Sequence, residues 1–178
     1  MNYNQIAELE NKGEYVMAIN ELYKEWQENE SDGKLLVRLS FECWYVLSER
    51  YRFNLSEAEC EKAKNILIQV KHKVLDSEIK DSYVLSHLGY MMTMFPEFFY
   101  NGEDEEMYEK HRMIGAKILK EAVEISPDNK MAELFMLGQE NKEKAYNKLK
   151  KQLKFQIKQE YVGTDCFDEY FRDVLTRE

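Results

Sequence analysis

The sequence is poor in residues that favour turns and has no long apolar run. Its 178 residues include only seven glycines and two prolines, too few for the many tight turns of a β-sandwich or barrel. No stretch approaches the roughly 18 uncharged apolar residues that a membrane-spanning helix needs. We therefore expect neither an all-β fold nor a contact with a membrane.

Cysteine is also scarce, and a secretion signal is not evident. The three cysteines, Cys43, Cys60 and Cys166, are widely spaced and form no CxxC pair, a pattern typical of reduced thiols rather than of a disulfide framework. The first five residues lack the basic start and apolar run of a signal peptide. We expect a cytoplasmic protein.

Basic residues are fewer than acidic ones, and the two kinds of charge are unevenly distributed along the chain. The chain carries 25 Lys+Arg against 34 Asp+Glu, for a net charge of −9, which argues against direct nucleic-acid binding because that depends on basic residues. Segments 1–32 and 97–109 each carry −6, whereas segment 142–158 carries +6. The basic segment is interpreted as a solvated helix face, which could also attract the acidic segments of the same chain.

What the sequence does contain is helical periodicity from end to end. Apolar residues make up 44% and aromatic residues 13%, enough for a core in a single domain spanning 1–178. Apolar positions recur at three- and four-residue intervals along about nine segments, which predicts about nine helices and no strand. The segment 35–53 is apolar on several faces, so we expect it to be a central helix.

Local signals place several helix ends. Ser56 followed by Glu59 is a capping box, and Asp165 followed by Asp168 predicts the start of a last helix. Pro96 is expected to end the helix before it.

Several of these segments share a further pattern, with a Leu-Gly pair on one helix, small residues on the next and a proline after it. Its positions are Gly13-Glu14-Tyr15, Ala18, Leu22, Leu85, Leu88-Gly89, Gly115, Leu119, Ala122, Pro127, Leu134 and Leu137-Gly138. In this pattern the chain resembles the tetratricopeptide family of paired-helix repeats.

The resemblance implies an all-α, irregular tetratricopeptide-like solenoid of about nine antiparallel helices. Small residues would let paired helices approach closely. The implied degenerate repeats span about 3–30, 34–75, 79–127 and 130–161, and a capping helix follows at 165–177. Segments 52–61 and 96–106 are longer than a regular repeat allows.

A search for catalytic chemistry returns little. The sequence contains no HExxH, GxGxxG, P-loop, GxSxG or EF-hand pattern. His87 and His111 lie on apolar helix stripes and are interpreted as core or boundary residues, while Cys43 and Cys60 have no evident basic neighbour to stabilise a thiolate. We predict no catalytic residue, no metal and no cofactor, and a hydrolase using paired carboxylates has no supporting spacing.

The most unusual segment runs from Phe95 to Gly102. Aromatic residues at a helix end are followed directly by acids. In one interpretation the rings complete the core and the acids cap the next helix. In the other the segment recognises a basic protein, with aromatic anchors among carboxylates. The candidate partner-binding residues are Phe98, Phe99, Tyr100, Glu103, Asp104, Glu105 and Glu106.

These features favour a protein-binding module over an enzyme. The chain resembles small tetratricopeptide-like immunity proteins of contact-dependent inhibition and other polymorphic toxin systems, and its 168–175 ending resembles the Tyr-Phe-x-x-x-Leu ending of such helical proteins. This resemblance implies neutralisation of a bacterial toxin, such as a basic nuclease, by stoichiometric binding. The alternative is a scaffold or chaperone that holds a peptide in a concave groove, although the candidate inner positions are mostly apolar, which suggests a filled groove. The oligomeric state stays open.

Overall fold

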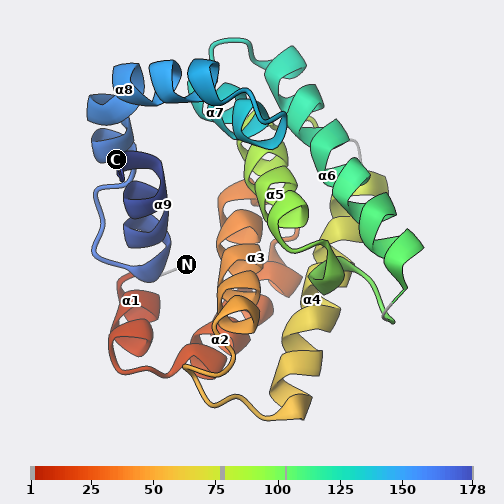
Figure 1. Cartoon of the computed structure of the whole chain (residues 1–178). Coiled ribbons are helices and arrows are strands. Elements are labelled where there is room, and N and C mark those ends of the chain that lie inside the picture. Colours follow the sequence, from red (N-terminus) through yellow and green to blue (C-terminus); the bar gives the residue numbers. More distant parts are fainter. Residues whose placement is uncertain (1–2, 77–78, 103, 178) are drawn as a thin grey trace.

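The structure is a computed structural model that describes residues 3–76, 79–102 and 104–177 (Figure 1). This part of the chain contains nine α-helices, one short 3₁₀ helix and no strand, so the prediction of an all-α protein is confirmed. The elements are α1 (Tyr3–Asn11), α2 (Tyr15–Glu28), α3 (Gly33–Ser48), α4 (Glu57–Asp76), α5 (Ser82–Met94), η1 (Pro96–Phe99), α6 (Glu105–Ile125), α7 (Lys130–Gln139), α8 (Glu143–Glu160) and α9 (Cys166–Thr176). None of these helices is both long and apolar enough to cross a membrane.

Side-chain caps fix several helix starts. The predicted capping box is confirmed, because the backbone N–H of Ser56 donates to Glu59 Oε2 at 2.8 Å and that of Glu59 to Ser56 Oγ at 3.3 Å. The predicted cap of the last helix is confirmed too, since Asp165 Oδ1 accepts from the N–H of Asp168 at 2.9 Å. Each cap satisfies backbone donors that a helix start leaves unpaired.

The predicted helix over 35–53 is wrong at both ends, since α3 begins at Gly33 and stops at Ser48. The backbone then turns, with Asn54 in the left-handed region at φ 50°. Phe53 extends the apolar pattern beyond the helix, because its ring packs back on Tyr15 of α2, with centroids 4.3 Å apart. Tyr51 also extends the pattern, but its side chain is 86% exposed and is not part of the core.

Helices α3 and α5 form the centre of the molecule. Twelve of the sixteen residues of α3 are buried, which confirms the predicted central helix. It contacts α2, α4, α5 and α9, while α5 contacts α3, α6, α7 and η1. Such burial on several sides explains why neither helix has a strongly polar face.

Two glycines allow α5 and α6 to come unusually close. A Cβ at Gly89 would lie 2.7 Å from Leu119 Cγ and 2.9 Å from the carbonyl oxygen of Gly115, and one at Gly115 would lie 2.8 Å from Met92 Cβ. These separations are shorter than real carbon contacts, so only glycine permits this approach. The predicted role of small residues in close helix packing is confirmed for this pair.

The last helix, α9, packs across α3, α5 and α7. The ring of Phe171 has its centroid 5.6 Å from that of Phe41, 5.6 Å from Tyr90 and 5.8 Å from Phe135, one ring from each of the three helices. The C-terminal helix therefore closes the apolar face of three earlier elements, and Figure 1 shows it beside α1 and α8.

Candidate functional site

The structure packs most of the aromatic rings between Phe95 and Tyr100. Phe99 is fully buried, and the ring of Phe98 stacks on that of Phe95 with centroids 5.2 Å apart. Tyr100 is 5% exposed and stacks on His111, with centroids 4.8 Å apart. The core interpretation therefore accounts for Phe99 and Tyr100, while Phe98 stays partly accessible.

A buried lysine anchors this segment to α4. Lys71 Nζ donates to the carbonyl oxygen of Phe99 at 2.8 Å and lies 3.2 Å from His111 Nε2. Because His111 Nδ1 lies 2.8 Å from the carbonyl oxygen of Met107, it carries the proton, and Nε2 accepts from the lysine. Burial lowers the pKa values of both Lys71 and His111. The predicted core position of His111 is confirmed.

The acidic residues after the rings begin α6. Asp104 caps the helix by accepting from the N–H of Glu106 at 2.8 Å, and Tyr100 Oη donates to the carbonyl oxygen of Asp104 at 3.2 Å. Glu105 and Glu106 are exposed in the first turn, where negative charge is favourable. The candidate residue Glu103 lies outside the described residues.

A groove lies between this segment and the helices facing it. Its volume is about 810 Å³, and it runs between the end of α3, the start of α4, η1 and the start of α6, where Figure 1 shows η1 between α4 and α6. Its walls carry three aromatic residues, five carboxylates and two cations, so its formal net charge is −3. These residues are Phe98, Tyr100, Tyr108, Glu57, Glu61, Glu97, Asp104, Glu105, Arg50 and Lys64.

The two cations of the groove are directed to aromatic rings. The guanidinium of Arg50 lies 4.7 Å from the ring centroid of Tyr51 and donates to its hydroxyl at 2.7 Å. Lys64 Nζ lies 5.7 Å from the ring centroid of Tyr100. Within the described residues, neither cation forms an ion pair with the groove carboxylates. The negative charge of the groove is therefore left without local pairing.

Glu97 is the least satisfied of these acids. Its Oε2 atom is buried and has no hydrogen-bond partner among the described residues. A buried carboxylate oxygen without a donor is costly to the folded state.

The groove contains four of the seven predicted site residues, namely Phe98, Tyr100, Asp104 and Glu105. Phe99 belongs to the core, and Glu106 lines a separate hollow of about 850 Å³ along α6, beside the 62% exposed Met113. Glu97 also lines the groove without being among the predicted residues, as do Glu57 and Glu61 of α4. Their spacing of four residues, continued by Lys64 three further on, marks one face of α4, but nothing local relates that face to the aromatic segment.

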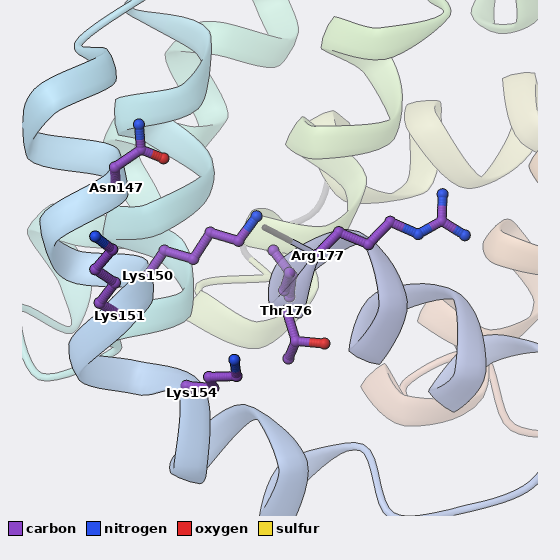
Figure 2. A pocket seen from close by; sticks show the side chains of 7 residues that line it. Asn147, Lys150, Lys151, Lys154, Thr176 and Arg177 are labelled. Carbon is purple, nitrogen blue, oxygen red and sulfur yellow. The ribbon is translucent and has the colours of Figure 1, made fainter.

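The basic segment lies far from this groove. Figure 1 shows α8 and the start of α6 on opposite sides of the molecule, so the basic segment and the acidic segment 97–109 do not come together within one chain. A pocket of about 450 Å³ lies between α8 and the end of α9, and no carboxylate of the described residues lines it. Figure 2 shows Lys150, Lys151, Lys154 and Arg177 around it. Lys150 Nζ lies 3.4 Å from the carbonyl oxygen of Val174, and cations at a helix C-terminus are stabilising.

The other candidate chemical groups are held in unreactive forms. His87 is buried, and its Nδ1 and Nε2 lie 2.8 Å from the carbonyl oxygen of Tyr83 and 3.0 Å from Tyr161 Oη. Burial lowers its pKa to about 4, so it is neutral at physiological pH. Burial raises the thiol pKa values of Cys43 and Cys60. The predicted interpretation of His87 as a core residue is confirmed. Within the described residues, no group of three or more potential ligands could hold a metal ion.

A second acidic cluster lies under α9, which we call the Arg38 cluster. Arg38 forms ion pairs with Glu10 of α1, with Asp165 at 2.6 Å and with Glu42 at 3.2 Å. Its guanidinium also lies 5.5 Å from the ring centroid of Phe167. Glu42 is fully buried, and desolvation raises its pKa well above the ordinary value. The cluster joins both ends of the chain to α3.

No protein-family model, curated protein or solved structure matches this chain. The tetratricopeptide-like organisation and the likeness to immunity proteins therefore stay predictions.

Proposed function

We propose that the protein is a non-catalytic binding module, an immunity protein that neutralises a cognate bacterial toxin by stoichiometric binding in the cytoplasm. The observation that carries the proposal is the groove, in which five carboxylates and three aromatic side chains lie together without paired cations. Such a surface suits a basic protein better than a neutral or acidic one.

A basic toxin domain, such as a nuclease, is the partner that this surface complements. Nucleases bind a polyanion, so their active sites gather positive charge. An acidic groove covering that site would exclude the substrate without any turnover. The field of an acidic protein also accelerates its encounter with a cationic one.

The absence of catalysis in this proposal has support beyond missing motifs. Both ring nitrogens of His87 have partners, and its pKa of about 4 keeps it from accepting a proton at neutral pH. The thiols of Cys43 and Cys60 have raised pKa values and so little thiolate.

The organisation that we propose is an irregular tetratricopeptide-like solenoid of antiparallel helices, divided into the repeats predicted above. It is supported by the contacts of α3 with α5 and of α5 with α7, which follow the expected inner layer, and by the contacts within the pairs α3–α4 and α5–α6. In this organisation α9 fills the inner face, which weakens the alternative of a scaffold holding a peptide there.

The decisive experiment is co-expression with the protein encoded beside this one. We expect a complex of fixed stoichiometry and rescue of growth from the neighbour's toxicity. A non-toxic neighbour, or toxicity that persists despite expression, would overturn the immunity proposal. Retention of short synthetic peptides by the isolated chain would instead support the scaffold alternative.

A pair of variants tests whether the groove is responsible. In one, Glu57, Glu61, Glu97 and Glu105 all become Gln. In the control, the exposed residues Glu8, Glu14, Glu21 and Glu28 of the N-terminal region become Gln, which changes the net charge equally. We expect the groove variant to associate more slowly with the partner and with weaker salt dependence, while the control keeps most of the wild-type rate. Equal association rates for the two variants would mean that the groove is not part of the interface.

A further inference from the structure

Two basic side chains meet where η1 packs between α4 and α6, and we call them the Lys71–His111 pair. Lys71 Nζ lies 3.2 Å from His111 Nε2, and it also donates to the carbonyl oxygen of Phe99 at 2.8 Å. Both residues are buried, with Lys71 5% and His111 4% exposed. Because an ammonium group can only donate, Nε2 must be an unprotonated acceptor. The contact therefore exists in one protonation state of the imidazole.

The other ring nitrogen cannot take over as the acceptor. His111 Nδ1 lies 2.8 Å from the carbonyl oxygen of Met107, to which it donates its proton. A second proton would have to go onto Nε2, where it meets the ammonium group of Lys71. Two N–H donors would then face each other, with two positive charges in a site from which water is largely excluded.

The charged groups around the pair do not offset a second positive charge. Burial lowers the pKa values of both members, Lys110 of α6 lowers both further, and His72 of α4 lowers that of the histidine. Asp76 is the acid that acts on the lysine, but its side chain is 78% exposed and lies beside His72. On the side of η1, the nearby charge is Lys64, over the ring of Tyr100. Within the described residues, neither member of the pair forms an ion pair.

The pair connects three elements that shape the groove. Lys71 belongs to α4 and His111 to α6, while the carbonyl group that accepts from the lysine belongs to Phe99 at the end of η1. Tyr100, the next residue, stacks on the imidazole with ring centroids 4.8 Å apart. Tyr100 and Phe98 both line the groove. The position of this aromatic wall therefore depends on a neutral His111.

We propose that His111 is a pH-sensitive switch that releases the η1 segment from α4 when its ring is protonated. A proton on Nε2 removes the acceptor of Lys71, so the ammonium and the imidazolium separate. The hydrogen bond to the Phe99 carbonyl and the stack with Tyr100 are lost with that contact, and the groove loses an aromatic wall. The switch goes beyond the proposed function and is a property of the isolated chain, whatever its partner.

The direction of the response follows from the histidine. The pKa of His111 in the folded chain lies below its ordinary value of 6.5, so the released form takes up the proton first as the pH falls. The closed arrangement is complete above pH 6.5 and is lost progressively below it. His87 responds to acid in the same direction but lies under α9, so the test needs a readout local to η1.

The test follows the full chain by NMR between pH 7.5 and pH 4.5. The backbone amide shifts of Phe99 and Tyr100 should move with the ring resonances of His111, with one common midpoint below pH 6.5. The nuclear Overhauser effect between the rings of Tyr100 and His111 should disappear over the same range. Titration of His111 with that effect retained and the two amides unmoved would contradict the switch.

Two variants separate the switch from a general effect of acid. His111→Gln keeps an oxygen that can accept from Lys71 but does not titrate, so the amide shifts of Phe99 and Tyr100 should become independent of pH. Lys71→Met removes the opposing charge and should raise the midpoint of the His111 titration by about one pH unit. His72→Gln is the control, because its side chain is 60% exposed, and it should keep the wild-type response.

Thermal unfolding at pH 7.5 verifies that each variant is folded, and Lys71→Met carries the test if His111→Gln is not. A response of η1 that persists in His111→Gln, or a His111 midpoint that Lys71→Met does not raise, would overturn the switch. None of these measurements uses a partner. Failure of the switch therefore leaves the proposed toxin binding in place, and failure of growth rescue leaves the switch in place.

Discussion

The Arg38 cluster and the groove are both places where carboxylates outnumber cations, yet the chain treats them in opposite ways. In the cluster, Glu10, Glu42 and Asp165 surround one guanidinium in the interior. In the groove, five carboxylates lie together, and the two cations are directed to aromatic rings. The carboxylates of the cluster are paired because Arg38 lies among them, whereas those of the groove stay unpaired because Arg50 is directed to Tyr51.

The largest expected effect comes from removing the guanidinium of the cluster. Arg38→Met should lower the free energy of unfolding by about 3–5 kcal/mol, because Glu10 and Glu42 lose the guanidinium that pairs with them in the interior. Urea unfolding at pH 7 measures this loss. Arg112→Met is the control, since Arg112 forms an exposed pair with Glu109 and should change stability by less than about 0.5 kcal/mol. Similar losses for both variants would contradict the contrast between buried and exposed charge.

Acid should weaken the region under α9 through His87, whose ring lies 5.1 Å from that of Phe171. Its folded pKa of about 4 lies below the ordinary 6.5, so the unfolded chain takes up the proton first as the pH falls. The stabilisation is complete above pH 6.5 and is lost progressively toward pH 4, by about 3 kcal/mol in total.

The measurement is the free energy of unfolding at pH 7, 6, 5 and 4 for the wild type and for His87→Gln. The variant should not show the loss of stability between pH 6.5 and pH 4 that His87 causes in the wild type. His72→Gln is the control, because its side chain is 60% exposed, and it should follow the wild type. If the free energy of unfolding fell equally with pH in the wild type and in His87→Gln, His87 would not be the cause of the decline.

Glu42→Gln should show the opposite pH dependence. The raised pKa of Glu42 means that the folded chain favours its protonated form, so wild-type stability contributed by this group is lost as the pH rises above 4.5. Glutamine is neutral at every pH. The variant should therefore gain stability relative to the wild type as the pH rises above 4.5. A difference between the two proteins that stays constant with pH would contradict the raised pKa of Glu42.

The smallest effect on stability is expected in the groove. Changing Glu57, Glu61, Glu97 and Glu105 together to Gln should alter the free energy of unfolding by no more than about 0.5 kcal/mol. Removing like charges is favourable, but Glu57 and Glu105 lose a favourable place in the first turns of α4 and α6, so the two effects oppose each other. A clear destabilisation in urea would mean that these carboxylates hold the fold together, as those of the Arg38 cluster do.

Sequence patterns predicted the features that depend on residues close together in the chain, such as helical segments and helix starts. Periodicity identified the helical segments, the Ser56–Glu59 and Asp165–Asp168 pairs located two helix starts, and the segment after Phe95 was singled out by its composition alone. The glycines of α5 and α6 were placed correctly because close packing needs small residues at helical spacing.

The remainder depends on contacts between distant residues, which periodicity does not encode. Glu57 and Glu61 reach the groove only because η1 packs on α4. Arg38 meets an aspartate 127 residues away, and Phe135, which no sequence pattern singled out, lies in the ring cluster under α9. The end of α3 was misplaced because Phe53 fits the helical period while packing from a turn.

The link between Arg38 and Asp165 also has a consequence for how the chain is made. Ribosomes build proteins from the N-terminus, so Glu10, Arg38 and Glu42 exist for most of synthesis before Asp165 and the ring of Phe167 are added. Closing a loop of this length comes late in folding, and until then the inner sides of α3 and α5 stay open to water. A chain that loses its last dozen residues would thus keep most of its helices and still fail to complete its interior.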